Sequence, residues 1–216
     1  MIAWPTPNHR LHDAPEKFFA RTRANPDYGK PGWTRDCGRR FHRGVDIAPV
    51  HATPTGAHTV VVFTDCTTGR DYESWEPVWI PHDPVFCVFD GTVIERVDDE
   101  SQSDFGRHVV IEHRWPRSGQ LFRTIYAHLD RIEIGDTGTF VAGGQRLGWM
   151  GQTARSPDAR NWLRIAPHLH FEVRAACDAP YDPVEFLRRY LPSNPTPVLG
   201  ATEQPSIDLT DCTGVG

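Results

Sequence analysis

The chain has 216 residues, which suits one domain with appendages, and 38% of them are hydrophobic, enough to form a core. The mean hydropathy is -0.49, and no apolar run approaches the ~20 residues of a membrane span, so a membrane-spanning protein is excluded. A net charge of -5 without a basic stripe argues against nucleic acid as a partner. The first residues lack the basic and then apolar segments of a signal peptide, so none is visible.

The first forty residues are rich in Pro, Arg, His and Gly, which predicts an irregular N-terminal arm packed on the main domain. One short helix is expected at about 14–24, with Pro15 near its first position. We expect Phe18 and Phe19 to hold this helix against the domain.

The segment 41–47 holds a histidine and an aspartate on either side of a glycine. Gly44 and the β-branched Val45 and Ile47 disfavour a helix, so we expect a turn that enters a strand. Gly44 would let the backbone fold closely enough for His42 and Asp46 to converge.

Residues 50–84 read as a hairpin-like insertion. A strand at 59–64 and a second strand at 72–80 flank turn residues at 67–71. Trp75 and Trp79 could line one wall of a binding groove, but we favour packing of both rings onto the sheet, because aromatic side chains dominate buried cores.

The rest of the chain alternates short apolar runs with turn signals. Strands are expected at about 85–89, 92–97, 108–113, 121–128 and 147–150, with a long polar loop at 152–166 and a short helix at 183–190. This spacing predicts an all-β fold of mainly antiparallel sheets, a sandwich or barrel-like hybrid with one or two short helices. Residues 191–216 are rich in Pro, Ser, Thr and Gly and predict a flexible tail.

The segment 167–174 carries the strongest chemical signal. On a strand, His168, His170 and Glu172 project to one side, whereas the apolar residues between them project to the other. Two imidazoles and a carboxylate suit a metal site. The alternative is a solvated strand face with two ordinary histidines.

Five cysteines are present, and none forms a Cys-x-x-Cys pair, so a cysteine zinc site is not expected. Cys66 could pair with Cys87, and Cys37 could pair with Cys177. Free or buried thiols are an equal alternative, and the sequence does not choose between these arrangements.

Three motifs in this order resemble the LytM/lysostaphin family of zinc endopeptidases, peptidase family M23. They are His42-x-Gly44-x-Asp46, Tyr126-x-His128-Leu129 and His168-Leu169-His170-Phe171-Glu172. The resemblance spans about 41–190 and implies a β-rich catalytic domain with its metal in a groove on one sheet. The family has a short connection where this chain has the insertion at 50–84.

The resemblance implies zinc ligands His42, Asp46 and His170, with His128 and His168 near the open position as catalytic residues. Zinc with three protein ligands keeps one position for water and can lower the pKa of that water to about 7. One imidazole would accept the proton and the other would stabilise the oxyanion or protonate the leaving amine. The sequence does not assign these two roles. Glu172 either orients an imidazole or is a plain carboxylate, and Tyr126 is either an oxyanion donor or a packing residue.

The resemblance therefore implies a metalloendopeptidase that cleaves peptide bonds in bacterial peptidoglycan, with D-alanyl cross-links favoured over glycine bridges. We expect a monomer, and the substrate implies an extracytoplasmic location. Two alternatives stay open: a non-catalytic binding or activator module on the same scaffold, and a non-haem iron oxygenase, which also uses two His and one carboxylate. The remaining histidines are expected to have structural or surface roles: His9, His12, His51, His58, His82, His108 and His113.

Overall fold

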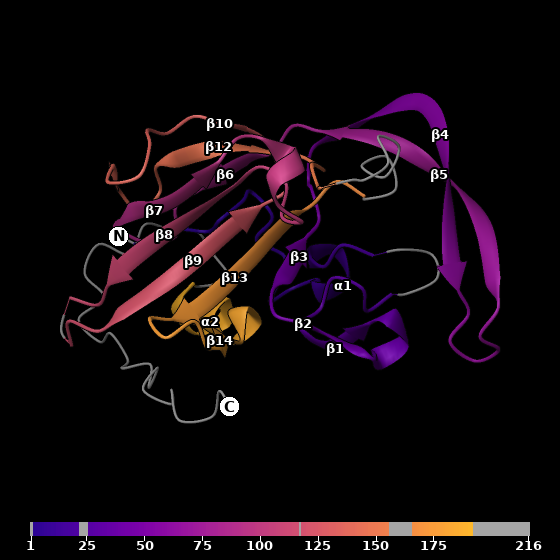
Figure 1. Ribbon diagram of the computed structural model, residues 1–216, viewed down its shortest axis with the longest axis horizontal. Helices are drawn as coiled ribbons and strands as arrows, with labels where there is room; N and C mark the ends of the chain where they lie inside the picture. The colour runs from indigo at the N-terminus through magenta and orange to yellow at the C-terminus, as the bar shows by residue number, and fades with distance from the viewer. Residues whose placement is uncertain (1, 22–25, 117, 156–165, 192–216) are drawn as a thin grey trace.

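The computed structural model describes residues 2–21, 26–116, 118–155 and 166–191. Its largest element is a seven-stranded antiparallel sheet, in which six strands follow the order β11-β7-β8-β9-β13-β14 (Figure 1). The seventh strand, β3, also pairs with β13, on the same edge as β14 but nearer the start of β13. The strands are β3 (Val45–Ile47), β7 (Gly91–Val97), β8 (His108–Arg114), β9 (Leu121–Ala127), β11 (Phe140–Val141), β13 (Leu169–Ala175) and β14 (Pro180–Tyr181).

A second antiparallel sheet has the order β10-β12-β6 and shares its hydrophobic core with the first sheet. Its strands are β6 (Pro84–Phe86), β10 (Leu129–Ile132) and β12 (Arg146–Met150). Val85 and Leu147 of this sheet belong to the same buried cluster as Val109 and Phe171 of the large sheet. The predicted class, mainly antiparallel β with short helices, is confirmed.

The large sheet has two faces of different character. Alternation sends Tyr126 and Phe171 into the shared core, whereas Ala127, His170 and Glu172 project to the opposite face. That face carries its own small apolar cluster of Val110, Ile125 and Ala127, against which Ile94 and Phe105 pack. The candidate site therefore lies on the face of the sheet away from the main core.

The helices are short. The predicted helix at 183–190 is confirmed as α2 (Pro183–Tyr190), and Asp182 caps it by accepting the N–H of Val184 at 2.8 Å. The helix expected at 14–24 is a single turn, α1 (Pro15–Phe18), because the chain leaves helical geometry at Phe19. The described residues also contain two 3-10 turns, η1 (Asp36–Gly38) and η2 (Glu100–Gln102). The described residues contain no helix that is long and apolar enough to cross a membrane.

The N-terminal segment contributes to the main core. Trp4, Leu11, Phe18 and Phe19 are all buried in it, as expected for the two phenylalanines. Farther on, β1 (Gly32–Arg35) and β2 (Arg40–His42) form a two-stranded sheet that leads directly into the site. Of the predicted tail at 191–216, only Leu191 lies within the described residues, and it is buried.

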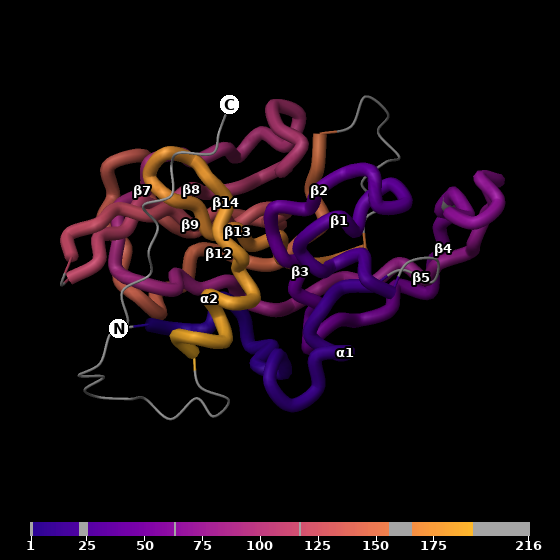
Figure 2. The backbone as a smooth tube through the Cα atoms, turned by 90° about the horizontal axis from the view of Figure 1, so that it is seen from below, coloured from indigo at the N-terminus to yellow at the C-terminus, as the bar shows by residue number. Residues whose placement is uncertain are grey.

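The predicted hairpin insertion is present as β4 (Ala52–Thr64) and β5 (Asp71–Pro81), and it projects away from the two sheets (Figure 2). Trp75 is 67% exposed and Trp79 is 38% exposed. The expectation that both rings pack onto the sheet is therefore wrong, because the hairpin extends beyond the sheet that they would cover.

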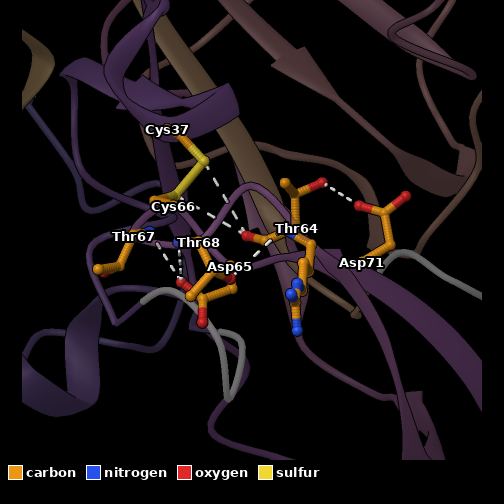
Figure 3. Close-up of a disulfide and its surroundings, with 8 residues drawn as sticks. Cys37, Thr64, Asp65, Cys66, Thr67, Thr68 and Asp71 are labelled. Atoms are coloured by element: carbon orange, nitrogen blue, oxygen red, sulfur yellow. Dashed lines mark hydrogen bonds between the residues drawn. A yellow bond between two sulfur atoms is a disulfide. The ribbon is translucent and has the colours of Figure 1, made fainter.

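The turn of the hairpin is fixed by a disulfide between Cys66 and Cys37 of η1 (Figure 3). Next to it, Asp65 accepts the N–H groups of Thr67 and Thr68, which shapes the turn. Neither disulfide suggested by the sequence forms, since Cys37 and Cys66 pair with each other and Cys87 is a buried free thiol. The pairing joins residues 29 apart, which become neighbours only when the hairpin folds back toward η1.

Candidate metal centre

The centre of the site is the pairing of β13 with β3. In this register His170 lies directly opposite Asp46, and Ala127 of β9 is its neighbour on the other side. Directly opposed residues on paired strands project to the same face, so the imidazole and the carboxylate meet. His170 Nδ1 lies 2.9 Å from Asp46 Oδ1.

His42, the last residue of β2, completes a triangle. Its Nε2 lies 3.1 Å from His170 Nδ1 and 3.2 Å from Asp46 Oδ1. Zinc bonds of about 2.0–2.1 Å in tetrahedral geometry separate two ligand atoms by about 3.3 Å. The three atoms are thus spaced as zinc ligands would be, and all three side chains are buried.

Hydrogen bonds to the second ring nitrogens orient both histidines. His42 Nδ1 lies 2.8 Å from the carbonyl oxygen of Lys30, to which it donates, so Nε2 faces the triangle. His170 Nε2 donates to Glu172 Oε1 at 2.8 Å, and Arg174 holds the same carboxylate at 2.7 Å. Of the two roles considered for Glu172, the contacts support the orienting one, which is the usual outer partner of a metal-binding histidine.

Sequence reasoning missed Arg35. This buried residue of β1 donates to Asp46 Oδ2, its Nη2 lies 3.0 Å from His42 Nε2, and its guanidinium stacks 3.5 Å above the ring of Tyr28. The available signal was Asp46 itself, because a fully buried carboxylate needs a positively charged partner. Several arginines precede His42, however, and their order in the chain does not select one.

The two further histidines meet at the same place. His128 follows β9 with a φ of 62°, and its Nδ1 lies 2.7 Å from the carbonyl oxygen of Thr153. His168 Nδ1 lies 2.6 Å from the carbonyl oxygen of Ala166, and its Nε2 lies 3.6 Å from Asp46 Oδ1. The two ring centroids are 4.8 Å apart. All five residues predicted from the motifs therefore converge.

The charges of the cluster follow from burial and from its neighbours. Burial opposes ionisation of Asp46, but His168, His170, His42 and Arg35 together hold its pKa well below the usual range. Burial lowers the pKa of His128 well below its ordinary value and also lowers that of His168. Both rings are therefore neutral near pH 7, with Nδ1–H donated to a carbonyl and Nε2 free to accept a proton.

Other candidate groups do not join the site. Within the described ranges, the only group of histidine, cysteine and acidic side chains spaced to hold a metal is His42, Asp46 and His170. Tyr126 points into the core, where its hydroxyl accepts the N–H of Val88 at 2.9 Å, so it is a packing residue and not an oxyanion donor. His113, expected to have a structural or surface role, is buried and stacked on Phe122.

The antiparallel sheet thus carries two histidines and an aspartate that could hold a metal ion, with two further imidazoles beside them. Residues 79–183, just under half of the chain, match the sequence model of Peptidase family M23. The match begins at residue 79, near the end of β5, so His42 and Asp46 lie outside it and are brought to the site by the fold.

Several solved structures are similar to the chain. The catalytic domain of the antimicrobial peptidase lysostaphin from Staphylococcus simulans has 21% identity and a TM-score of 0.45, over 74% of this chain and 89% of that one. The catalytic domain of a prophage-encoded M23 protein from Enterococcus faecalis has 18% identity and a TM-score of 0.44, over 77% and 88%. A zinc-containing peptidase from Vibrio cholerae has 27% identity and a TM-score of 0.37, over 68% and 40%. No curated protein matches the chain.

Proposed function

We propose that this protein is an M23 peptidase, a zinc-dependent endopeptidase that hydrolyses peptide bonds in bacterial peptidoglycan, with D-alanyl cross-links as its preferred bonds. The observation that carries the proposal is the triangle of His42, Asp46 and His170 atoms at 2.9–3.2 Å, the spacing of zinc ligands. When bound there, zinc would supply a Lewis acid that lowers the pKa of a water to about 7.

The chain's own groups would handle the protons. His128 and His168 are both neutral and both present Nε2, so either ring can accept a proton from the attacking water. After that transfer the protonated ring can donate its Nε2–H to the developing oxyanion and then pass the proton to the leaving amine. Arg35 and Glu172 would not touch the substrate but would fix Asp46 and His170.

The disulfide supports a location outside the cytoplasm, which is part of the proposal. Structural disulfides persist mainly in oxidising compartments. Alkylation of intact cells before lysis tests this location: Cys37 and Cys66 should resist labelling until a reductant is added. Labelling without reductant would place the protein in a reducing compartment.

The function is tested on the purified full chain by metal analysis and by release of muropeptides from cell walls. We expect about one zinc per chain, loss of activity with a chelator, and newly freed D-alanyl carboxylates among the products. His170→Ala should lose both zinc and activity. His128→Ala should keep zinc and lose about 10²–10⁴-fold in rate, whereas the exposed His58→Ala should match wild type.

Three results would contradict the proposal. A metal-free, inactive protein would indicate a binding module, and bound iron would indicate an oxygenase. Zinc-dependent cleavage of glycine bridges alone would retain the peptidase and overturn the preference for D-alanyl bonds.

A further inference from the structure

A cavity of about 690 Å³ lies beside the candidate metal centre, between the base of the β4–β5 hairpin and β12. Its floor is the segment 149–153, which also positions both assisting imidazoles: Thr153 accepts from His128, and Gly151 pairs with His168. A ligand in this cavity would therefore contact the segment that positions His128 and His168. The volume is in the range of small-ligand pockets, about 300–1,000 Å³.

The hairpin wall of the cavity is fixed at both ends. At the base, the buried Asp83 accepts the N–H groups of Val50 and His51, and its Oδ1 lies 2.7 Å from His51 Nδ1. At the turn, Cys66 is bonded to Cys37. Trp79, near the base of β5, is thus presented to the cavity from a wall held at two points.

The cavity lining combines two indoles, those of Trp79 and Trp149, with balanced charges. Two carboxylates, Glu100 and Asp130, face two guanidinium groups, Arg107 and Arg131, so the formal charges cancel. Arg107 is held in place by donating to the carbonyl oxygens of Asp98 and Asp130 at 2.9 and 2.8 Å. Such a lining suits a ligand with no net charge, an apolar face and several hydroxyl or amide groups.

A peptide is a poorer fit for this cavity. Extended peptides bind sheets by adding a strand to an open edge. At the floor, β12 is paired on both edges, by β10 and by β6. At the start of β10, the N–H of Leu129 already donates to the carbonyl oxygen of Arg107. A ligand in the cavity would therefore contact side chains and not a free strand edge.

We propose that this cavity binds a neutral N-acetylated hexose unit of the glycan strand to which the peptide substrate is attached. One pyranose C–H face would stack on Trp79, and the ring hydroxyls would bond to Glu100 and Arg107. The proposal rests on the proposed function for the choice of polymer, and it makes the hairpin the element that selects glycan-linked peptides over free ones.

The test is calorimetric titration of metal-free full-length protein with a peptide-free tetramer of N-acetylglucosamine. Metal-free protein separates this result from peptidase activity, so either proposal can fail alone. We expect saturable binding that weakens about tenfold or more in Trp79→Ala and changes less than about twofold in Trp75→Ala. Trp75 is the matched control because it is a more exposed tryptophan of the same strand and does not line the cavity.

A sugar-free stem peptide is titrated in parallel, and thermal melting of both variants checks that they fold. Absence of saturable sugar binding would overturn the proposal. Equal losses in the two variants would overturn it as well, since they would mark non-specific contact with exposed rings. If Trp79→Ala weakened the peptide and left the sugar unaffected, the cavity would be a peptide subsite.

Discussion

Gly44 packs against the ring of His170 so closely that a Cβ atom at Gly44 would lie 2.5 Å from His170 Cε1 and 2.9 Å from Glu172 Cγ. The backbone of Gly44 is not in the left-handed region, so the reason for glycine here is space and not dihedral freedom. Because Gly44 has no side chain, the ring of His170 can lie next to His42 and Asp46.

Gly44→Ala is expected to displace the His170 ring and separate it from Glu172. We predict a fall of about 10–100-fold in zinc affinity, measured by competition with a chelator, and a loss of about 1–3 kcal/mol in unfolding free energy from overpacking. Gly91→Ala is the control, since its Cβ would meet Glu112 O at 2.6 Å, far from the site in the same sheet. It should destabilise the fold and leave zinc affinity unchanged; equal zinc affinity in both variants would refute the prediction.

Glu172→Gln keeps the size of the side chain and removes the charge that orients His170. Glu172 has a pKa lowered to about 2, since His170 and Arg174 outweigh the effect of burial, so the group is ionised at neutral pH. We expect zinc affinity to fall about 10–100-fold. The control is Glu112→Gln, which alters the half-buried ion pair of Glu112 with Arg123 and should leave zinc affinity unchanged. A Glu172→Gln protein with wild-type zinc affinity would show that the hydrogen bond alone suffices.

Arg35→Met removes the guanidinium that pairs with the buried Asp46 carboxylate. In chelator-treated protein we predict a loss of about 3–5 kcal/mol in unfolding free energy, measured with urea, as for other broken buried ion pairs. Arg40→Met removes the exposed pair with Asp36 in the same segment and should cost less than about 1 kcal/mol. Similar losses in the two variants would mean that Arg35 does not stabilise Asp46.

His113 makes stability depend on pH. Burial lowers its pKa to about 4 from an unfolded value of 6.5, so the unfolded chain binds more protons between these values. The stabilisation is complete above pH 6.5 and is lost as the pH falls toward 4. Between pH 7 and 4, wild type should lose up to about 3 kcal/mol more than His113→Gln in urea unfolding. Parallel pH profiles for the two proteins would contradict this assignment.

Local pattern was sufficient for much of the fold, whereas the five motif residues were selected by the resemblance to a known family. Strict alternation at 168–173 assigned each side chain to a face, because the period of a strand is two residues. The helix at 183–190 was predicted from the helical spacing of its apolar residues, which is an equally local signal.

Tertiary structure alone decided the partners. That Arg35 binds Asp46, that Cys37 joins Cys66, and that Trp75 and Trp79 stay exposed all depend on where the hairpin and the β1–β2 sheet are placed. His170 and Asp46 are 124 residues apart, and their contact is set by the register of β13 on β3. Packing of the whole sheet fixes that register, so no window of sequence contains it.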